Sequence, residues 1–340
     1  MAWLIFFLSY PVPICLLCTL IILASLFLPT SSRKAAFTMP PGPTPLPIIG
    51  NLHLLDIKRQ DKSILKLAKK YGPVFTLHFG FQKVVVLTGY EAVKDALVNF
   101  TEEFVDRPLI PIFEQIQHGH GVFFSTGELW RATRRFTMSS MRNLGVGRTL
   151  IEERILEELS FLVEDIKAFK GEPFSLRTFN RAPTNITFVL LFGEREICFE
   201  VGLGYNQEHQ KVGHAHVGLQ KETFPGSGHR GTMVIPSLTS VLLDKSHWET
   251  PDEFNPNHFL DAEGKFVKKE AFVPFSLGRR NCMGESLAKM ELFLFFAGLL
   301  QKFTFQPPPG LTERDLDLTV PQTTFTLRPQ PQLTCAVPHD

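Results

Sequence analysis

The ten residues FSLGRRNCMG, Phe275 to Gly284, place one cysteine directly before an apolar run at 285–303. The run is apolar on nearly every side of a helix, so it predicts a helix in the core of the fold. Cys282 then lies where unpaired backbone N–H groups and the positive end of the helix dipole favour an anion. Two interpretations of Cys282 follow: an ordinary buried thiol, or a thiolate held for chemistry.

The residues around Cys282 bear on this choice through their size and charge. Gly278 and Gly284 have no Cβ, so the backbone can bend tightly and a flat ligand can come close. Arg280 adds a cation two residues from the sulfur, and cations beside a thiol favour the thiolate. These neighbours suit a nucleophile or a metal ligand, whereas the alternative is a small buried residue with surface arginines around it.

The N-terminal part predicts a membrane anchor followed by a stiff hinge. Residues 1–32 carry no charged side chain, and ICLLCTLIILASLFL at 14–28 is almost wholly apolar. This span is long enough to cross a bilayer, and Arg33 with Lys34 behind it places the rest on the cytoplasmic side. The alternative is a buried N-terminal core helix. The prolines of MPPGPTPLPIIGN forbid a helix, so the hinge at 33–51 is expected to be an extended spacer.

Composition excludes several classes of protein. The formal net charge of +1 gives no global field that would attract nucleic acid. The five cysteines are an odd number and form no CxxC repeat outside the apolar N-terminal span, so a disulfide framework is not expected. In a cytoplasmic domain the thiols would stay reduced.

Local patterns predict mostly helices, with a few short strands. Helical periodicity marks 63–72, 90–100, 149–169 and 285–303, a helix beginning after Ser125 or Thr126, and a short helix after Pro236. Strand patterns mark a hairpin within 73–89, a strand at 232–235 and short strands within 318–329. The segment 196–231 keeps neither period, so no element is predicted there.

The spacing of the cysteine loop resembles a known signature. Phe275, Gly278, Arg280, Cys282 and Gly284 spell F-x-x-G-x-R-x-C-x-G, which is similar to the haem-thiolate signature of the cytochromes P450. Other parts resemble the same family in chain order: the apolar anchor and proline-rich hinge of its microsomal family 2 members, FVDRP at 104–108, WRATRR at 130–135 and FNPNHFL at 254–260.

The resemblance implies a cytochrome P450 fold at 52–340, mainly α with small β-sheets, behind an N-terminal membrane anchor. Cys282 would be the axial ligand of haem iron, with Gly278 and Gly284 in its loop and Phe275 packed against the haem. The haem propionates would be bound by four further residues: Arg107, Trp130, Arg134 and Arg280. The loop at about 109–121 would help to line the substrate pocket.

The same resemblance implies an activity and its partners. Members of the family insert one oxygen atom from O2 into apolar small molecules such as xenobiotics, fatty acids or steroids. The implied cofactor is haem b, with electrons from NADPH through cytochrome P450 reductase and a further role for cytochrome b5. The implied location is the endoplasmic reticulum membrane. Arg131, Arg135, Arg279 and Lys289 would form the surface for the electron donor, or else a merely solvated face.

The chain also departs from the family pattern. In the family a long I helix carries an acid–alcohol pair, and an E-x-x-R pair locks the haem loop. Neither is expected anywhere in this chain, and 196–231 is the atypical junction where this block is missing. The I helix would form one wall of the haem site. The alternative function is therefore a catalytically inactive, truncated variant that does not hold haem properly.

Two weaker patterns complete the sequence. HGHG at 118–121 and GHAH at 213–216 could suggest a metal site, but no carboxylate or cysteine cluster accompanies them. Asn99 and Asn185 match glycosylation acceptors, which a cytoplasmic topology would leave unmodified.

Overall fold

The computed structural model describes Thr19 and residues 39–108, 110–193, 220–222, 231–312, 315, 322–323, 327–328 and 331–339. The predicted anchor at 1–32, except for Thr19, and most of the junction at 196–231 therefore lie outside the described residues. Within the described part of the chain, no helix is long and apolar enough to cross a membrane.

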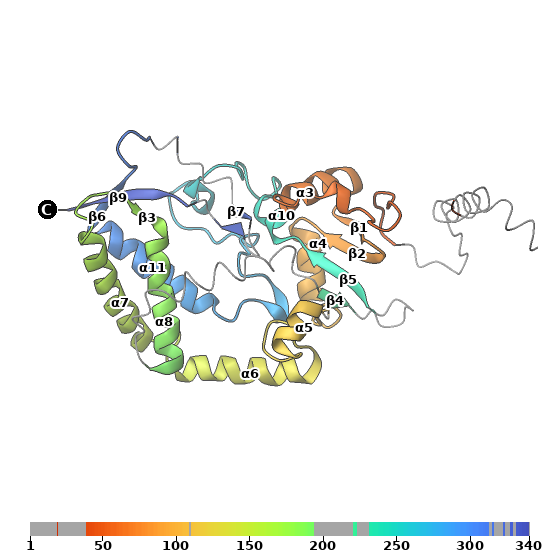
Figure 1. Cartoon of the computed structure of the whole chain (residues 1–340), viewed down its shortest axis with the longest axis horizontal. Coiled ribbons are helices and arrows are strands. Elements are labelled where there is room, and N and C mark those ends of the chain that lie inside the picture. The colour runs from red at the N-terminus through yellow and green to blue at the C-terminus, as the bar shows by residue number, and fades with distance from the viewer. Residues whose placement is uncertain are drawn as a thin grey trace, which may run out of the picture.

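Helices dominate the fold, as the sequence predicts. The longer helices are α3 (Gln60–Tyr71), α6 (Gly127–Asn143), α7 (Thr149–Lys167), α8 (Arg181–Phe192) and α11 (Glu285–Leu300). Shorter helices are α4 (Tyr90–Lys94), α5 (Pro111–Gln117) and α10 (Leu238–Leu242), with a π-helical turn η2 (Asp95–Asn99) and the 3-10 turns η1 (Leu52–Leu54), η3 (Leu176–Asn180), η5 (Pro256–Phe259) and η6 (Gly278–Arg280). Figure 1 shows α6 spanning the base of the molecule between a strand side and a helix side.

The main sheet has the order β1-β2-β5-β4. Its strands are β1 (Val74–Phe79), β2 (Gln82–Leu87), β5 (Thr232–Pro236) and β4 (Gln220–Glu222). The hairpin predicted within 73–89 is confirmed: β1 and β2 are antiparallel, and Gly80 takes a φ of 62° in the turn. Beyond the junction, β5 joins β2 in parallel, so the sheet combines segments from both sides of it.

Two smaller sheets lie elsewhere in the fold. β9 (Leu333–Pro338) pairs with β3 (Phe174–Ser175) and with β6 (Phe303–Gln306), always antiparallel. β7 (Gln322–Thr323) and β8 (Leu327–Arg328) form a separate pair. The predicted C-terminal strands are thus present within the described residues.

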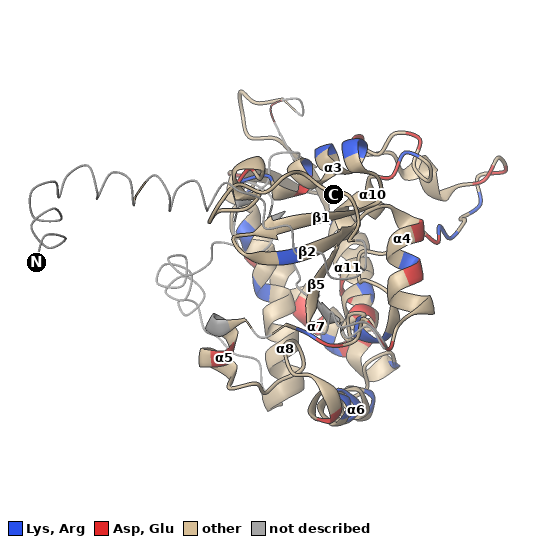
Figure 2. Cartoon of the chain, turned by 90° about the vertical axis from the view of Figure 1, so that its right-hand side faces the viewer, with Lys and Arg blue, Asp and Glu red and all other residues tan. Residues whose placement is uncertain are grey.

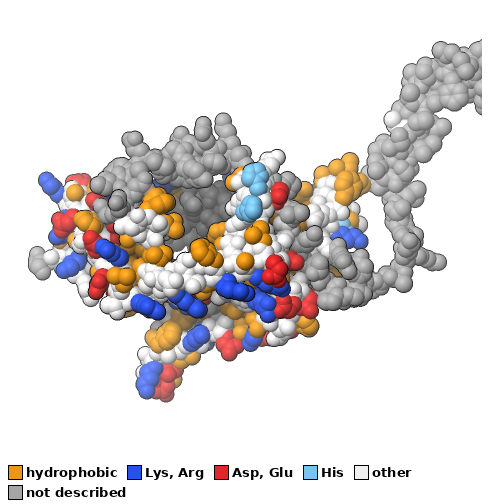
Figure 3. Space-filling model, turned by 90° about the horizontal axis from the view of Figure 1, so that it is seen from below, with side chains coloured by type: hydrophobic (Ala, Val, Ile, Leu, Met, Phe, Trp, Pro, Cys, Tyr) orange, Lys and Arg blue, Asp and Glu red, His pale blue; other side chains and the backbone are white. Residues whose placement is uncertain are grey.

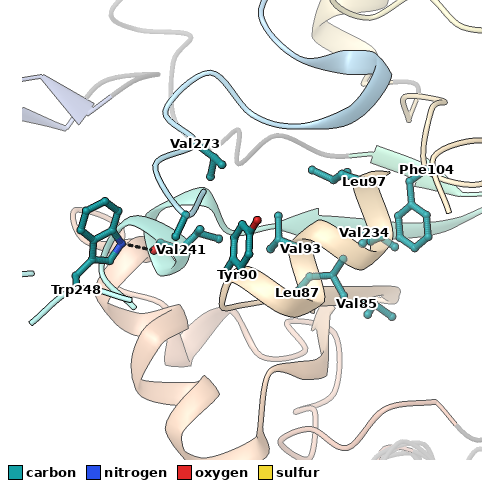
Figure 4. Packing of buried hydrophobic residues seen from close by; sticks show 12 residues of the cluster. Val85, Leu87, Tyr90, Val93, Leu97, Phe104, Val234, Val241, Trp248 and Val273 are labelled. Atoms are coloured by element: carbon teal, nitrogen blue, oxygen red, sulfur yellow. Dashed lines mark hydrogen bonds between the residues drawn. The ribbon is translucent and has the colours of Figure 1, made fainter. Parts of the chain in front are cut away.

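The strand side has two continuous hydrophobic cores. One lies between β1, β2, β5 and α3 and includes Ile64, Phe75, Leu77 and Ile235, each less than 5% exposed. The other packs α4, η2 and α10 against the sheet and extends to Trp248, whose indole N–H donates to the Val241 carbonyl at 3.1 Å (Figure 4). These cores fix the base from which η2 reaches the cysteine loop.

The described part of the hinge, residues 39–51, is attached to this strand side. The backbone N–H of Thr76 donates to the Pro41 carbonyl at 2.9 Å, and the Asn51 amide donates to the Thr44 carbonyl at 3.1 Å. The backbone N–H of His78 in turn donates to Asn51 Oδ1 at 2.8 Å. These bonds hold the segment against β1, whereas a free spacer is expected from its prolines.

The helix side is built from α7, α8 and α11. One face of α11 packs on α7, where a Cβ at Gly298 would lie 2.3 Å from Leu159 Cδ2. The opposite face is exposed: Leu292, Phe293 and Phe296 are 66–71% accessible to solvent. The prediction of a helix at 285–303 is confirmed, but its complete burial is wrong, because only one side of α11 has a neighbour among the described elements.

Candidate functional site

The cysteine loop joins η6 to α11. Cys282 lies two residues before Gly284, the residue that begins α11, and its thiol is exposed. The backbone N–H of Cys282 donates to the Phe275 carbonyl at 2.8 Å, which closes the loop. A Cβ at Gly284 would lie 3.9 Å from the Cys282 sulfur. The sulfur is therefore presented to solvent at the positive end of a helix dipole.

The two glycines of the loop differ in what they leave room for. Gly278 has a φ of 70°, and a Cβ there would lie 1.9 Å from the carbonyl oxygen of Leu97 in η2. Its small size thus lets the loop pack on η2, whereas the sequence predicts that it makes room for a flat ligand. Gly284 is the glycine that lies beside the sulfur.

Arg280 lies at the centre of a polar cluster next to this loop. Its Nε donates to the Val105 carbonyl at 2.6 Å, Nη1 to the Val122 carbonyl at 3.3 Å and Nη2 to the Ser125 carbonyl at 2.7 Å. Its guanidinium carbon also lies 3.9 Å from the ring centre of Trp130, a cation–π distance. Arg280 is therefore held by backbone and indole together.

Arg134 ties α6 to the cysteine loop. Its Nη2 donates to the Asn281 backbone carbonyl at 3.0 Å and to Asn281 Oδ1 at 2.6 Å. Arg134 also lies over Trp130, with 5.9 Å between its guanidinium carbon and the ring centre. Because Asn281 immediately precedes Cys282, this contact fixes the residue next to the sulfur.

The cluster carries concentrated positive charge. Burial, followed by the nearby Arg107, lowers the pKa of Arg280 to about 9. Burial lowers the pKa of Arg107 to about 10, and it also lowers the pKa of Arg134. Since the neighbouring guanidinium groups repel one another, an anion placed among them would be stabilised.

Trp130 is the buried residue of the cluster whose hydrogen-bond donor lacks an acceptor among the described residues. Its side chain is 3% exposed, and its Nε1 has no hydrogen-bond partner in the described part of the chain. A buried N–H without an acceptor costs about 1–3 kcal/mol. The site therefore combines an unsatisfied donor with three guanidinium groups, and carboxylates would match both.

Phe275 and the four surface cations show the edge of this site. Phe275 is half-buried, with the Lys289 ammonium 5.7 Å from its ring centre. Lys289 pairs with Glu285 at 2.6 Å, and Glu102 pairs with both Arg131, at 3.8 Å, and Arg279. Arg135 is exposed on α6. The basic positions of this helix are coloured blue on the ribbon in Figure 2, and basic side chains gather on the face seen in Figure 3. Three of these four cations are thus already bonded to carboxylates.

The expectation that the chain has no E-x-x-R tetrapeptide is wrong, because one does occur. It is Glu128 to Arg131, on the first turns of α6, where the two side chains form an exposed ion pair with each other. This pair lies at the surface of the helix that carries Trp130, so it does not supply the pair expected before the haem loop.

Other candidate residues have ordinary structural surroundings. No group of three metal-ligating side chains is present among the described residues, which include His118 and His120. Asn185 is buried, and its amide donates to the carboxylate of Glu158 at 2.7 Å. The Thr250 backbone N–H donates to His258 Nε2 at 3.2 Å.

The model of the family "Cytochrome P450" matches residues 40–207 and 228–336, which is more than half of the chain. The chain belongs to the cytochrome P450 family. Its relatives include cytochrome P450 2W1 of Homo sapiens, at 36% identity over 88% of this chain and 94% of the relative. Cytochrome P450 2K1 of Oncorhynchus mykiss is 32% identical over 95% of this chain and 96% of the relative. Cytochrome P450 2C40 of Mus musculus is 30% identical over 90% of this chain and 95% of the relative.

The comparisons also place the missing block. The alignment with the human relative extends over 459 positions, whereas the chain has 340 residues, so more than one hundred positions of the relative have no counterpart here. The family match is interrupted between residues 207 and 228, inside the predicted junction at 196–231. The internal truncation predicted from the sequence is therefore confirmed.

Family membership implies a haem cofactor, and the described residues fit its carboxylates. The indole N–H of Trp130 lacks an acceptor among the described residues, Arg134 and Arg280 lie over its ring, and Arg107 is close to Arg280. The thiol of Cys282 is exposed in the adjacent loop. Local sequence patterns could identify these side chains, but they gave no signal for the backbone carbonyls of Val105, Val122 and Ser125 that hold Arg280.

Proposed function

We propose that this chain binds haem b with Cys282 as the axial thiolate and works as a monooxygenase on apolar small molecules. The unpartnered indole N–H of Trp130, buried within an arginine cluster beside the Cys282 loop, is the observation that carries this proposal. A propionate placed there would give Trp130 an acceptor and the arginines a counter-charge. When bound, thiolate-ligated haem supplies the activation of O2.

Each residue of the site would have a separate task. Cys282 holds the iron from the N-terminal end of α11, where the dipole stabilises the thiolate. Arg134 holds Asn281, and hence the approach to the sulfur, in place. Gly284 leaves the sulfur accessible, and Gly278 seats the loop on η2. Phe275 would pack against the haem.

Trp130, Arg107 and Arg280 orient the haem by binding its propionates. They would hold the propionates through N–H donors, because guanidinium groups and an indole N–H suit carboxylates.

The partners follow from the same assignment. Residues 1–32 would anchor the chain in the endoplasmic reticulum membrane, with the haem domain on the cytoplasmic side. Electrons would come from NADPH through cytochrome P450 reductase, and cytochrome b5 would be a second donor. The basic face of α6, with Arg135 exposed, supports contact with an acidic protein surface. Xenobiotic, fatty acid or steroid-type molecules are the substrate classes proposed.

A second candidate function is a catalytically inactive truncated variant that cannot hold haem properly. The exposed face of α11, with Leu292, Phe293 and Phe296 open to solvent, favours this alternative. More than one hundred positions of the relatives are missing, so part of the apolar enclosure of a haem is missing as well. Such a protein would keep the cysteine loop and the arginine cluster without stable thiolate ligation.

The experiment that separates the two is the difference spectrum of the reduced, carbon-monoxide-bound protein, produced in membranes with excess haem. We expect the long-wavelength Soret band that thiolate ligation gives, and its loss in Cys282→Ser. The control is Cys335→Ser, because Cys335 is buried on β9, away from the site. A short-wavelength band or no haem in the unmodified chain would establish the inactive variant.

A second variant tests the observation that carries the proposal. Trp130→Phe removes the indole N–H while keeping an aromatic ring under Arg280. We expect the affinity for haem to fall about tenfold, the usual effect of losing one hydrogen bond to a charged group. Haem titration followed by the Soret absorbance measures this. Unchanged affinity would show that Trp130 does not bind a propionate.

A further inference from the structure

The loop at 106–121 leaves the strand side and returns to it at almost the same place. Val105 precedes the loop and Val122 follows it, and the carbonyl oxygens of both accept hydrogen bonds from one side chain, Arg280. The carbonyl of Ser125, three residues further on, accepts the third bond. Arg280 comes from the cysteine loop, more than 150 residues later in the chain. It therefore joins both ends of one loop to a distant segment.

Two further hydrogen bonds close the base of this loop. The backbone N–H of Gly127 donates to Asp106 Oδ1 at 3.2 Å, and the Ser125 hydroxyl donates to the Gly121 carbonyl. Both are local bonds between the end of the loop and its own start or flank. Arg280, in contrast, connects the base of the loop to the segment that carries Cys282.

The loop packs against the segment that directly follows it. Phe113 on α5 stacks on Phe124 with 3.9 Å between ring centres and an interplanar angle of 15°. The cavity beside this pair has a volume of about 10 Å³, which is space for one water molecule. The loop is thus packed against residues beside its own base, and the bonds at that base hold both of its ends.

We propose that Arg280 is a positioning residue that clamps the loop at 106–121 to the Cys282 segment and does so without haem. A guanidinium group has five N–H bonds, of which three are used by the carbonyls. The remaining two stay available for a carboxylate, so Arg280 connects a substrate-lining loop with the haem site. An effect of this clamp on substrate selection rests on the proposed function. The clamp itself does not depend on that function.

The test is hydrogen–deuterium exchange on the full chain in detergent micelles, prepared without haem. The variants are R280Q, which removes the charge, and R280K, which keeps the charge but cannot reach three carbonyls. The control is R279Q, because Arg279 is the neighbouring arginine and forms an exposed ion pair with Glu102 instead. Peptides covering 105–125 report the clamp, and peptides covering the β1–β2 hairpin report general stability.

We expect exchange in 105–125 to rise at least tenfold in both Arg280 variants, with the hairpin and the R279Q protein unchanged. Equal acceleration in the loop and the hairpin would show a general loss of stability and overturn the clamp. Wild-type protection in R280K would also overturn it, since charge alone would then suffice. If R280Q does not fold, R280K alone decides the question. Because no haem is present, failure here is separate from failure of haem binding.

Discussion

The strand side and the helix side of this molecule bury their apolar residues to very different extents. On the strand side Phe75, Leu77 and Val84 are completely buried between β1, β2 and their neighbours. On the helix side Phe293, a residue of the same kind as Phe75, is 71% exposed on α11. Both sides contain apolar segments, but only one of them has all its packing partners in this chain.

The place of the missing block explains this difference. The family match stops at residue 207 and resumes at 228, just after α8 and just before β5. β5 still reaches β2 and pairs with it in parallel, so the main sheet remains continuous across the junction. The outer face of α11 has no neighbour among the described elements, so its apolar side chains stay exposed. Strand pairing thus continues across the junction, whereas α11 is packed on one side only.

The largest expected effect is a loss of stability from a substitution on the strand side, which a matching substitution on the helix side should not cause. Phe75→Ala removes a ring from a filled core, so we expect the free energy of unfolding to fall by about 3–5 kcal/mol. Phe293→Ala removes a mostly exposed ring, so we expect a change of about 0.5 kcal/mol or less. Urea unfolding of both variants, followed by circular dichroism, measures the difference.

The same two variants can also show that the difference between the strand side and the helix side does not exist in solution. A loss of about 2 kcal/mol or more in Phe293→Ala would mean that something covers α11 in solution. Repeating the measurement at several protein concentrations would then show whether a second copy of the chain is the cover. Phe75→Ala serves as the internal reference for a filled site.

The sequence could predict much of this architecture because the signals are local. The hairpin at 73–89, the strand at 232–235 and the helix at 285–303 each follow from periodicity and turn residues. The exposure of α11 could not be predicted in that way, since its residues are apolar on all sides whether or not a partner is present. Nor does any local pattern state that β5 pairs with β2, because that pairing joins segments about 150 residues apart.

The candidate site also has features that the sequence could predict and features that it could not. The motif around Cys282 and the arginines on α6 could be recognised from residue types and spacing. The role of Gly278 could not, because its close contact is the backbone of Leu97. The three carbonyls that hold Arg280 also depend on backbone positions, for which side-chain patterns give no signal.

A smaller effect is expected where the strand side meets the cysteine loop. Gly278→Ala combines a φ of 70° with a Cβ 1.9 Å from the Leu97 carbonyl, so we expect a loss of about 2–3 kcal/mol in unfolding free energy. The control is Gly264→Ala, where φ is 76° and no atom lies within 4 Å of the added Cβ. That change should cost about 1 kcal/mol, the cost of the left-handed conformation alone. Equal losses in the two variants would show that η2 and the loop are not in tight contact.

The next prediction concerns Glu291 on α11. Burial raises its pKa to about 7, and its Oε1 has no partner within the described ranges. The folded pKa is higher than the ordinary value of 4.5, so folding favours the protonated acid. The stabilisation is complete below pH 4.5 and is lost as the pH rises through about 7. With allowance for solvent screening of a half-buried group, we expect a decrease of about 1–2 kcal/mol between pH 5 and pH 8.

Glu291→Gln should remove this part of the pH dependence, because glutamine does not titrate. The measurement is the free energy of unfolding of both proteins in urea at intervals from pH 5 to pH 8. We expect the two curves to converge at low pH and to separate as the pH rises, with the variant more stable at pH 8. Parallel curves would show that Glu291 is solvated or paired in the folded protein, and the helix side would then lack the buried polar cost assigned to it.

The smallest effect is expected from the ion pairs that join the two sides at the surface. Glu102 follows η2 on the strand side and pairs with Arg131 of α6 and with Arg279 of the cysteine loop. Exposed ion pairs contribute little, because water screens them and ordering the side chains costs entropy. We therefore expect Glu102→Gln to destabilise the protein by less than Gly264→Ala does, and the effect to vanish in high salt. The control is Glu103→Gln, one residue further on. A Glu102→Gln loss larger than that of Gly278→Ala, unchanged by salt, would mean that charge rather than backbone packing holds the cysteine loop to the strand side.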